Sequence, residues 1–144
     1  MTYVPARLRD LVVVRARESC EYCLLHASYA VFAHEVDHVI ARQHGGATTA
    51  DNLAYACAQC NRFKGSNVAA PDPQSGMIAP LFNPRTSSWR DHFRLDGPLI
   101  VPLSMIGRVT ERLLQFNQID RVMLRAELIA VRRYPFRLGE LVAV

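Results

Sequence analysis

The sequence predicts an α+β protein in which a small mixed unit is held by a metal site and followed by a helical extension. Two C-x-x-C pairs frame the mixed unit, and 33 residues lie between Cys23 and Cys57. Within that gap the stretch 30–40 is rich in Val, Phe and Ile, as strands are. Apolar residues then recur at helical spacing from 103 to about 133. We therefore assign residues 1–70 to the mixed unit and residues 71–144 to a connector and a helical extension packed on it.

Local patterns predict the first elements in order. A helix is expected over residues 5–18, because Pro5 suits a first turn and apolar side chains follow at helical spacing. The segment 30–40 is expected to hold a β-hairpin, with its later strand from about Ala33 to Val39. The dipeptide Gly45-Gly46 then marks a turn.

A second helix is expected to begin near Asn52, because residues 49–51 offer N-cap side chains. This helix would carry Leu53 to Ala56, then continue or restart after the second cysteine pair. Gly65 is a suitable residue for its C-terminal cap.

The C-terminal half is predicted to be extended first and helical later. Four prolines lie within residues 66–88, which indicates a connector, with Ile78 to Phe82 as an apolar anchor. One or two short strands are expected between Trp89 and Val101, around the turn dipeptide Asp96-Gly97. Two amphipathic helices are then expected between Leu103 and about Arg133.

Composition favours a globular protein over a membrane or secreted one. Half of the 144 residues are hydrophobic, which is enough to form a buried core. The chain has no apolar stretch of about 18 residues, so no transmembrane helix is expected. The N-terminal apolar run, Leu11 to Val14, is too short for a signal peptide. A cytoplasmic location is therefore the default expectation.

The positive charge of the chain is carried almost entirely by arginine. The formal net charge is +4, and Lys64 is the one lysine among 17 basic residues. Arginine has a planar fork of donors that suits phosphate oxygens, so the composition is compatible with nucleic-acid binding. A coding bias that replaces lysine by arginine explains the same composition, and charge alone does not decide between them.

The cysteine pattern predicts a structural zinc site. Cys20, Cys23, Cys57 and Cys60 form two C-x-x-C pairs with none left over. Zinc in structural sites prefers four thiolates in a tetrahedron, and each pair supplies two of them. Without a secretion signal, disulfides are the weaker interpretation, and a redox C-x-x-C usually stands alone. Such a coordination shell is closed, so this metal would hold the fold and take no part in catalysis.

A second set of residues lies between and after the cysteine pairs. In order these are Asp37-His38, Gly45-Gly46, Asn52-Leu53, and Asn61 with Lys64-Gly65 behind Cys60. The sequence here resembles the HNH endonuclease family, part of the wider His-Me finger group, which has these elements in the same order. The resemblance covers residues 20 to 65. It implies a ββα-metal core, in which a hairpin packs on a helix, and a nuclease that cuts DNA.

The resemblance also implies a role for each matched residue. His38 matches the general base, and Asn52 matches the central residue that holds the loop and orients the base. Asp37 and Asn61 match the two ligands of a catalytic divalent metal. Many members have His at the last position, so this chain is an HNN variant. An amide oxygen is a harder ligand than imidazole, which favours Mg²⁺ or Mn²⁺.

Simpler readings of the same residues stay open. Asp37 would also suit an exposed acid or a cap, His38 a hydrogen-bonded core histidine, Asn52 a cap and Asn61 a turn. His34 and Glu35 flank the motif, either supporting it or facing solvent. Candidate DNA contacts are Arg42, Arg62 and Lys64, and each is equally compatible with plain surface.

The arginines of the predicted C-terminal helices have two interpretations. They form either solvated helix faces or a grip on the DNA backbone that reads no sequence. They are Arg108, Arg112, Arg121, Arg125, Arg132 and Arg133.

The sequence as a whole predicts a DNA endonuclease that uses one divalent metal and a histidine base. The alternative of another class is a zinc-dependent DNA-binding module without catalytic activity. A further alternative is a protein-interaction domain that uses the helical extension as its interface.

Overall fold

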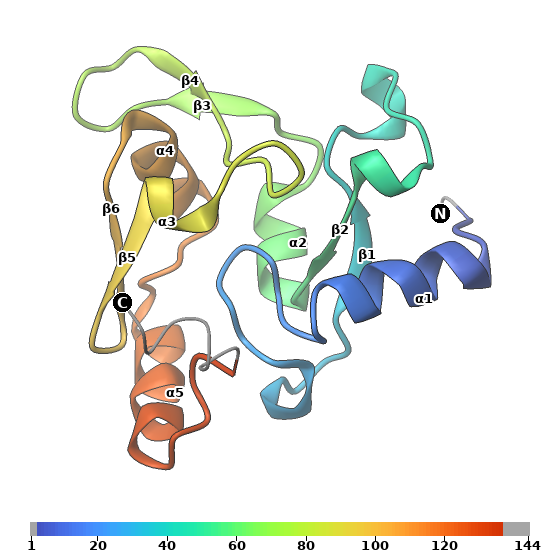
Figure 1. Cartoon of the computed structure of the whole chain (residues 1–144). Coiled ribbons are helices and arrows are strands. Elements are labelled where there is room, and N and C mark those ends of the chain that lie inside the picture. Colours follow the sequence, from blue (N-terminus) through green and yellow to red (C-terminus); the bar gives the residue numbers. More distant parts are fainter. Residues whose placement is uncertain (1–2, 137–144) are drawn as a thin grey trace.

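The computed structural model describes residues 3–136, and over this range the chain is α+β, as the sequence predicts. The helices are α1 (Ala6–Arg15), α2 (Ala58–Lys64), α3 (Trp89–His92), α4 (Met105–Leu113) and α5 (Ile119–Ala130). The strands pair antiparallel as β1 (Glu35–His38) with β2 (Leu53–Ala56), β3 (Ala69–Pro71) with β4 (Ile78–Pro80), and β5 (Phe93–Asp96) with β6 (Leu99–Pro102). In Figure 1, α1, β1, β2 and α2 lie on one side and the elements from β3 to α5 on the other.

The β1–β2 pair is a two-faced ribbon between two helices. Its register pairs Val36 with Tyr55 and His38 with Leu53. Because partners in an antiparallel pair share a face, these four side chains lie on one side. There Leu53, Val36 and Tyr55 pack with Val12 of α1. The opposite side carries Asp37 and the small residues Ala54 and Ala56, and α2 packs on that side.

The structure corrects the prediction that Leu53 to Ala56 are helical. They form β2, preceded by a single 3₁₀ turn at Ala50–Asn52, and Thr49 makes no side-chain cap there. Leu53, Ala54 and Ala56 are fully buried because apolar neighbours cover both faces of the strand. A strand buried on both faces shows no polar alternation, so its sequence resembles that of a buried helix.

The same pairing corrects the expected hairpin. Only the later of its two expected strands forms, and its partner is β2, across a loop from 39 to 52. The earlier part of segment 30–40 is irregular, and Val31 and Phe32 are largely exposed. Apolar composition alone predicted a strand here, but these side chains have no neighbouring sheet to pack on.

The C-terminal half keeps the predicted strands around Gly97 and the two later helices, but the β3–β4 hairpin lies within the expected connector, and Trp89–His92 is helical where a strand was expected. Ala79, Leu81 and Phe82 are buried, so the proline-rich connector is anchored where expected. The β5–β6 hairpin turns at Gly97, which has a positive φ of 55°. Helix α4 begins at the N-cap Ser104, whose side chain accepts a hydrogen bond from the Gly107 N–H.

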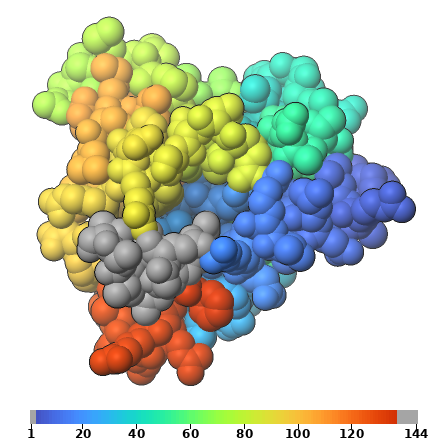
Figure 2. Space-filling view, in the orientation of Figure 1, coloured from blue at the N-terminus to red at the C-terminus, as the bar shows by residue number. Residues whose placement is uncertain are grey.

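One buried apolar cluster joins the two halves. It runs from the four cysteines through Phe82 and Phe93 to Leu114 and Phe116. Figure 2 shows the yellow part of the chain seated between the orange part and the blue and green parts. In the described range no helix has the length and apolar character that crossing a bilayer requires.

The β3–β4 hairpin is tied to α4 by a buried carboxylate. Asp72 is 1 % exposed, and its two oxygens accept hydrogen bonds from Arg108 at 2.8 and 2.9 Å. The same carboxylate accepts from the Gln74 and Ser75 amides and from the Ser75 hydroxyl, which closes the turn. The Arg108 hydrogen bonds hold the pKa of Asp72 well below its usual range, although burial opposes them.

We predict that Asp72→Asn lowers the free energy of unfolding in a pH-dependent way. Because the folded-state pKa is depressed, the carboxylate stabilises the fold above its unfolded pKa of about 3.9 and loses this effect as pH falls. The difference between wild type and variant should therefore be largest near neutral pH and shrink below about pH 4. Urea unfolding at several pH values measures it. Asp96→Asn, at the exposed turn of the β5–β6 hairpin, is the matched control and should leave stability nearly unchanged.

Candidate metal centre and adjoining polar site

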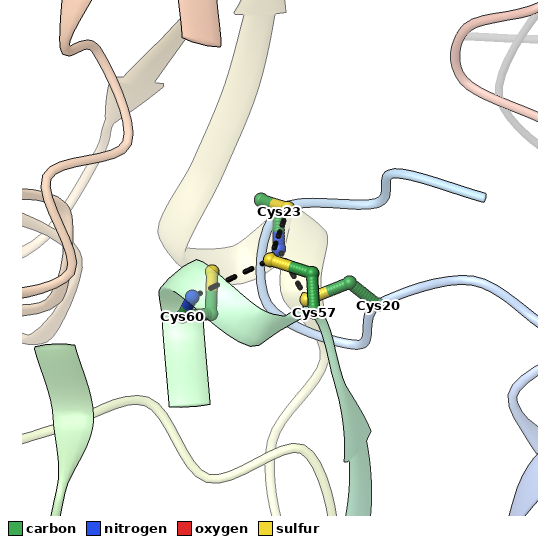
Figure 3. Close-up of side chains that lie close together, drawn as sticks. All are labelled: Cys20, Cys23, Cys57 and Cys60. Atoms are coloured by element: carbon green, nitrogen blue, oxygen red, sulfur yellow. Dashed lines mark hydrogen bonds between the residues drawn. The ribbon is translucent and has the colours of Figure 1, made fainter. Parts of the chain in front are cut away.

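The four cysteines predicted to bind zinc meet at one buried point. Their Sγ atoms all lie within 4.8 Å of one another, and no disulfide joins them. Cys20 and Cys23 come from the loop after α1, whereas Cys57 is the N-cap of α2 and Cys60 lies in its first turn (Figure 3). In Figure 3 the side chains point toward a common centre.

This geometry fits a tetrahedral zinc ion. With zinc–sulfur bonds of about 2.3 Å, the sulfurs of a tetrahedral site lie about 3.8 Å apart. The Cys23 and Cys57 Sγ atoms lie 3.7 Å apart. Backbone amides point at the sulfurs, from Tyr22 and Cys23 to Cys20 Sγ and from Cys60 to Cys57 Sγ, each at 3.4 Å. The cluster is therefore a candidate zinc site, as the cysteine pattern predicts.

Burial makes a bound cation necessary for four thiolates at this point. Cys20 and Cys60 are fully buried, and burial raises the pKa of both thiols well above the ordinary value. Without a cation these thiols would stay protonated at neutral pH, because buried negative charges close together repel each other. A Zn²⁺ ion would supply the compensating charge and bind the deprotonated sulfurs.

The C-terminal half packs directly on this centre. Trp89 Nε1 donates to the Tyr22 carbonyl and the Tyr134 hydroxyl donates to the Cys23 carbonyl, at 2.8 and 2.7 Å. Arg85 forms an ion pair with Glu21, whose carboxylate also accepts from the Tyr55 amide. The first cysteine pair is therefore held by residues more than 60 positions later in the chain.

A second polar site lies between β1 and α2. Glu35 and Asp37 alternate with Val36 along β1, so they share the face toward α2. Asn61 Nδ2 donates to Glu35 Oε2 at 2.8 Å, and Lys64 Nζ lies 3.0 Å from Asp37 Oδ2. Asn61 and Lys64 are one turn apart on α2, so two polar pairs cross the interface side by side.

His38 ends β1 and is held by the loop that follows. Its Nε2 lies 2.8 Å from the Thr48 hydroxyl, which also accepts from Arg42 Nη1 at 3.0 Å. Asp37 and His38 point to opposite faces of β1 because they are adjacent. His38 is the last residue of the strand and is partly buried, on the face of the ribbon that also carries Leu53. The Lys64 ammonium donates to the His38 carbonyl and so connects the two residues.

Asn52 closes the loop between β1 and β2. Its Oδ1 accepts from the Ile40 amide, and its Nδ2 donates to the carbonyls of Ile40 and Ala47, all at 2.9 Å. Gly46 sits inside this closure, where a Cβ would lie 1.7 Å from the Ile40 carbonyl oxygen. Only glycine fits there, which explains the Gly-Gly step. The loop that carries Thr48 is thereby fixed against the end of β1.

Burial shifts the ionisation of both residues at the end of β1. It raises the pKa of Asp37, while the Lys64 ammonium lowers it. It lowers the pKa of His38, while the Asp37 carboxylate opposes the shift. The lowered pKa favours the neutral form of the His38 ring at neutral pH.

The candidate DNA contacts differ in exposure. Arg42 and Arg62 are exposed, and the Arg62 guanidinium lies over the Phe63 ring. Lys64 is only 2 % exposed and is directed at Asp37, so its charge faces the interior.

Burial also separates the C-terminal arginines. Arg121 and Arg125 are 5 % and 3 % exposed, which fits neither a solvated face nor a grip on DNA. Arg112, Arg132 and Arg133 are exposed, whereas Arg108 binds Asp72.

The sequence did not point to Thr48, nor to the contact of Arg121 with the cysteine cluster. Thr48 lies in a polar loop, and no local pattern links it to a histidine ten residues earlier. Arg121 Nη2 lies 3.0 Å from Cys60 Sγ, although 61 positions separate the two residues. One signal was available for Arg121, since its position follows the apolar spacing of α5 and places it on the buried face.

Comparison with known proteins identifies the segment that contains both sites. Residues 20–67 match the family model described as HNH endonuclease. This segment begins at the first zinc-site cysteine and ends three residues after Lys64, so it includes β1, β2 and α2. No curated protein and no solved structure matched the chain.

We predict that freshly purified, reduced protein contains one tightly bound zinc per chain. Cys60→Ser should abolish binding and cooperative unfolding, since zinc binding contributes roughly 10–16 kcal/mol to small structural sites at neutral pH. Elemental analysis and thermal unfolding measure the two effects. Co²⁺ exchanged into the site should show the charge-transfer bands of a tetrahedral tetrathiolate. A zinc-free native protein with a cooperative transition would contradict the assignment.

Proposed function

Because residues 20–67 form an HNH domain, we propose that the protein is a metal-dependent endonuclease that hydrolyses phosphodiester bonds in DNA. The observation that carries the proposal is the contact between β1 and α2, where Asn61 donates to Glu35 and Lys64 pairs with Asp37, next to His38 at the end of the strand. This hairpin-and-helix arrangement is compatible with the ββα-metal core that the sequence resemblance implies.

Asp37 and Asn61 would hold the catalytic metal. Both offer oxygen ligands, which suit Mg²⁺ or Mn²⁺. Glu35 accepts a hydrogen bond from the Asn61 amide nitrogen, which turns the Asn61 oxygen away from Glu35 and leaves it for a cation. With two protein ligands, such an ion retains positions for phosphate oxygens and stabilises the charge that develops on the leaving oxygen.

His38 would act as the general base. If Nε2–H donates to the Thr48 hydroxyl, Nδ1 is the nitrogen that accepts a proton from the attacking water. The lowered pKa of His38 keeps the ring in this neutral form. Thr48 is then a positioning residue that fixes both the ring and its tautomer, and Asn52 holds the loop from which Thr48 projects.

Exposed arginines on either side of the site would bind the DNA backbone. Arg42 reaches Thr48 from the loop after β1, and Arg62 projects from α2. Arginine contacts with phosphate position DNA without reading its sequence. We expect Lys64 to act inside the protein, where it orients Asp37 and balances its charge when no metal is bound.

The Lys64–Asp37 ion pair supports one alternative function. A carboxylate already neutralised by a buried ammonium has less need of a metal, as in a zinc-dependent DNA-binding module without catalytic activity. DNA binding without metal-dependent cleavage would identify this alternative.

We predict that wild-type protein converts supercoiled plasmid to nicked or linear DNA when Mg²⁺ or Mn²⁺ is added. His38→Ala should lower the rate by about 10²–10⁴-fold, which is the usual contribution of a general base. Gel analysis of timed plasmid digests measures both rates. Zinc content and the unfolding midpoint should be unchanged, since His38 lies outside the cysteine cluster.

The matched control for His38 is His92→Ala in the C-terminal half, where the imidazole is hydrogen-bonded to Ser104 and packs against aromatic side chains. This variant should cleave at close to the wild-type rate if it folds normally. Equal cleavage by wild type and His38→Ala would refute the catalytic assignment.

A separate prediction concerns Thr48. Thr48→Val retains the shape of the side chain but removes the hydroxyl, and should lower kcat about three- to tenfold, as loss of one hydrogen bond does. Thr48→Ser should restore the rate, whereas KM and stability should change little. Thr49→Val, at the exposed neighbouring position, is the matched control. A loss of rate that Thr48→Ser fails to rescue would contradict the positioning role.

A further inference from the structure

A buried arginine from the C-terminal half contacts the cysteine cluster. Arg121 lies in the first turn of α5 and is 5 % exposed. Its Nη2 atom lies 3.0 Å from Cys60 Sγ and 3.7 Å from Cys57 Sγ. We propose that Arg121 is an outer cation of this metal site, which retains the bound zinc and protects the two sulfurs of the α2 knuckle.

The charge of the occupied site explains why a cation belongs there. Four thiolates around Zn²⁺ carry a net charge of −2, and all four cysteines are buried. A buried charge is costly unless it is paired and hydrogen-bonded. The guanidinium cancels half of that charge and donates N–H groups to the sulfurs. It thereby lowers the tendency of those thiolates to take up a proton or attack an electrophile.

Arg121 is held so that one edge of its fork faces the sulfurs. Nη1 donates to the carbonyls of Leu114 and Gln115, at 2.6 and 3.2 Å, where α4 ends. Nη2 remains for Cys57 and Cys60. The side chain therefore connects the C-terminus of α4 with the metal site, and metal binding stabilises the docking of the extension on the HNH domain.

The neighbouring Arg125 is a control for the loss of a buried arginine that does not contact the sulfurs. It lies one turn later on α5, is 3 % exposed and donates to the carbonyls of Pro98 and Phe116 and to Asn117. Each of these bonds is to oxygen. Loss of Arg125 therefore removes a buried cation and its backbone hydrogen bonds without removing a contact to sulfur.

The test compares zinc loss from folded Arg121→Met and Arg125→Met proteins. The rate of zinc transfer to a chromogenic chelator is measured under conditions where each variant stays folded, and global unfolding is measured separately with urea. Arg121→Met should release zinc about 10–100-fold faster, as expected when an outer partner of a metal ligand is removed. Arg125→Met should release zinc within about twofold of the wild-type rate, because its loss leaves the shell of the metal intact. Equal release by the two variants would overturn the proposal.

Two measurements on Arg121→Lys test the proposal if Arg121→Met does not fold. Arg121→Lys retains the charge but lacks the fork, and should release zinc at an intermediate rate. In Co²⁺-substituted Arg121→Lys, the sulfur-to-cobalt charge-transfer band should move to lower energy, because fewer N–H groups stabilise the sulfur electrons. An unchanged band and a wild-type release rate would overturn the proposal. Neither readout depends on DNA cleavage, so failure of the nuclease proposal leaves this one standing.

Discussion

The contacts around four buried sulfurs set the positions of the other elements. Cys20 and Cys23 end the segment after α1, and Cys57 and Cys60 start α2, so one metal ion would fix the helix relative to the ribbon of β1 and β2. Trp89, Arg121 and Tyr134 then bring the C-terminal half onto the same point.

The candidate catalytic site uses this rigidity. Asn61 directly follows Cys60, so a metal that fixes the knuckle would also fix the amide that contacts Glu35. On the other side, Asn52 and Gly46 close the loop that brings Thr48 to His38. The two metals would therefore have different tasks. In the proposed arrangement a closed thiolate shell would hold the framework, and the oxygens of Asp37 and Asn61 beside it would bind a divalent cation that contacts phosphate.

Three basic side chains that the sequence suggested for the surface are buried in the structure. Lys64, which would suit a surface phosphate contact, instead faces Asp37 across the interface of β1 and α2. Arg121 and Arg125, which the helical pattern left open to solvent or DNA, point inward to sulfur and to carbonyl oxygens. Each of these groups is buried with a partner, as buried charges must be. The extension is therefore part of the structure that supports the site.

The sequence by itself predicted the cysteine cluster and the family of the segment that contains it. The spacing of the cysteines predicted the metal cluster, and the order of Asp37, His38, Asn52 and Asn61 predicted the domain that residues 20–67 match. Helical periodicity also placed α1, α4 and α5, because each has one buried face. Only the tertiary structure decided that Leu53 to Ala56 form a strand, since both of its faces are covered and no alternation remains to mark it. It alone brought Thr48 to His38 and Arg121 to Cys60, because contacts between distant positions depend on how the elements pack and leave no local pattern in the sequence.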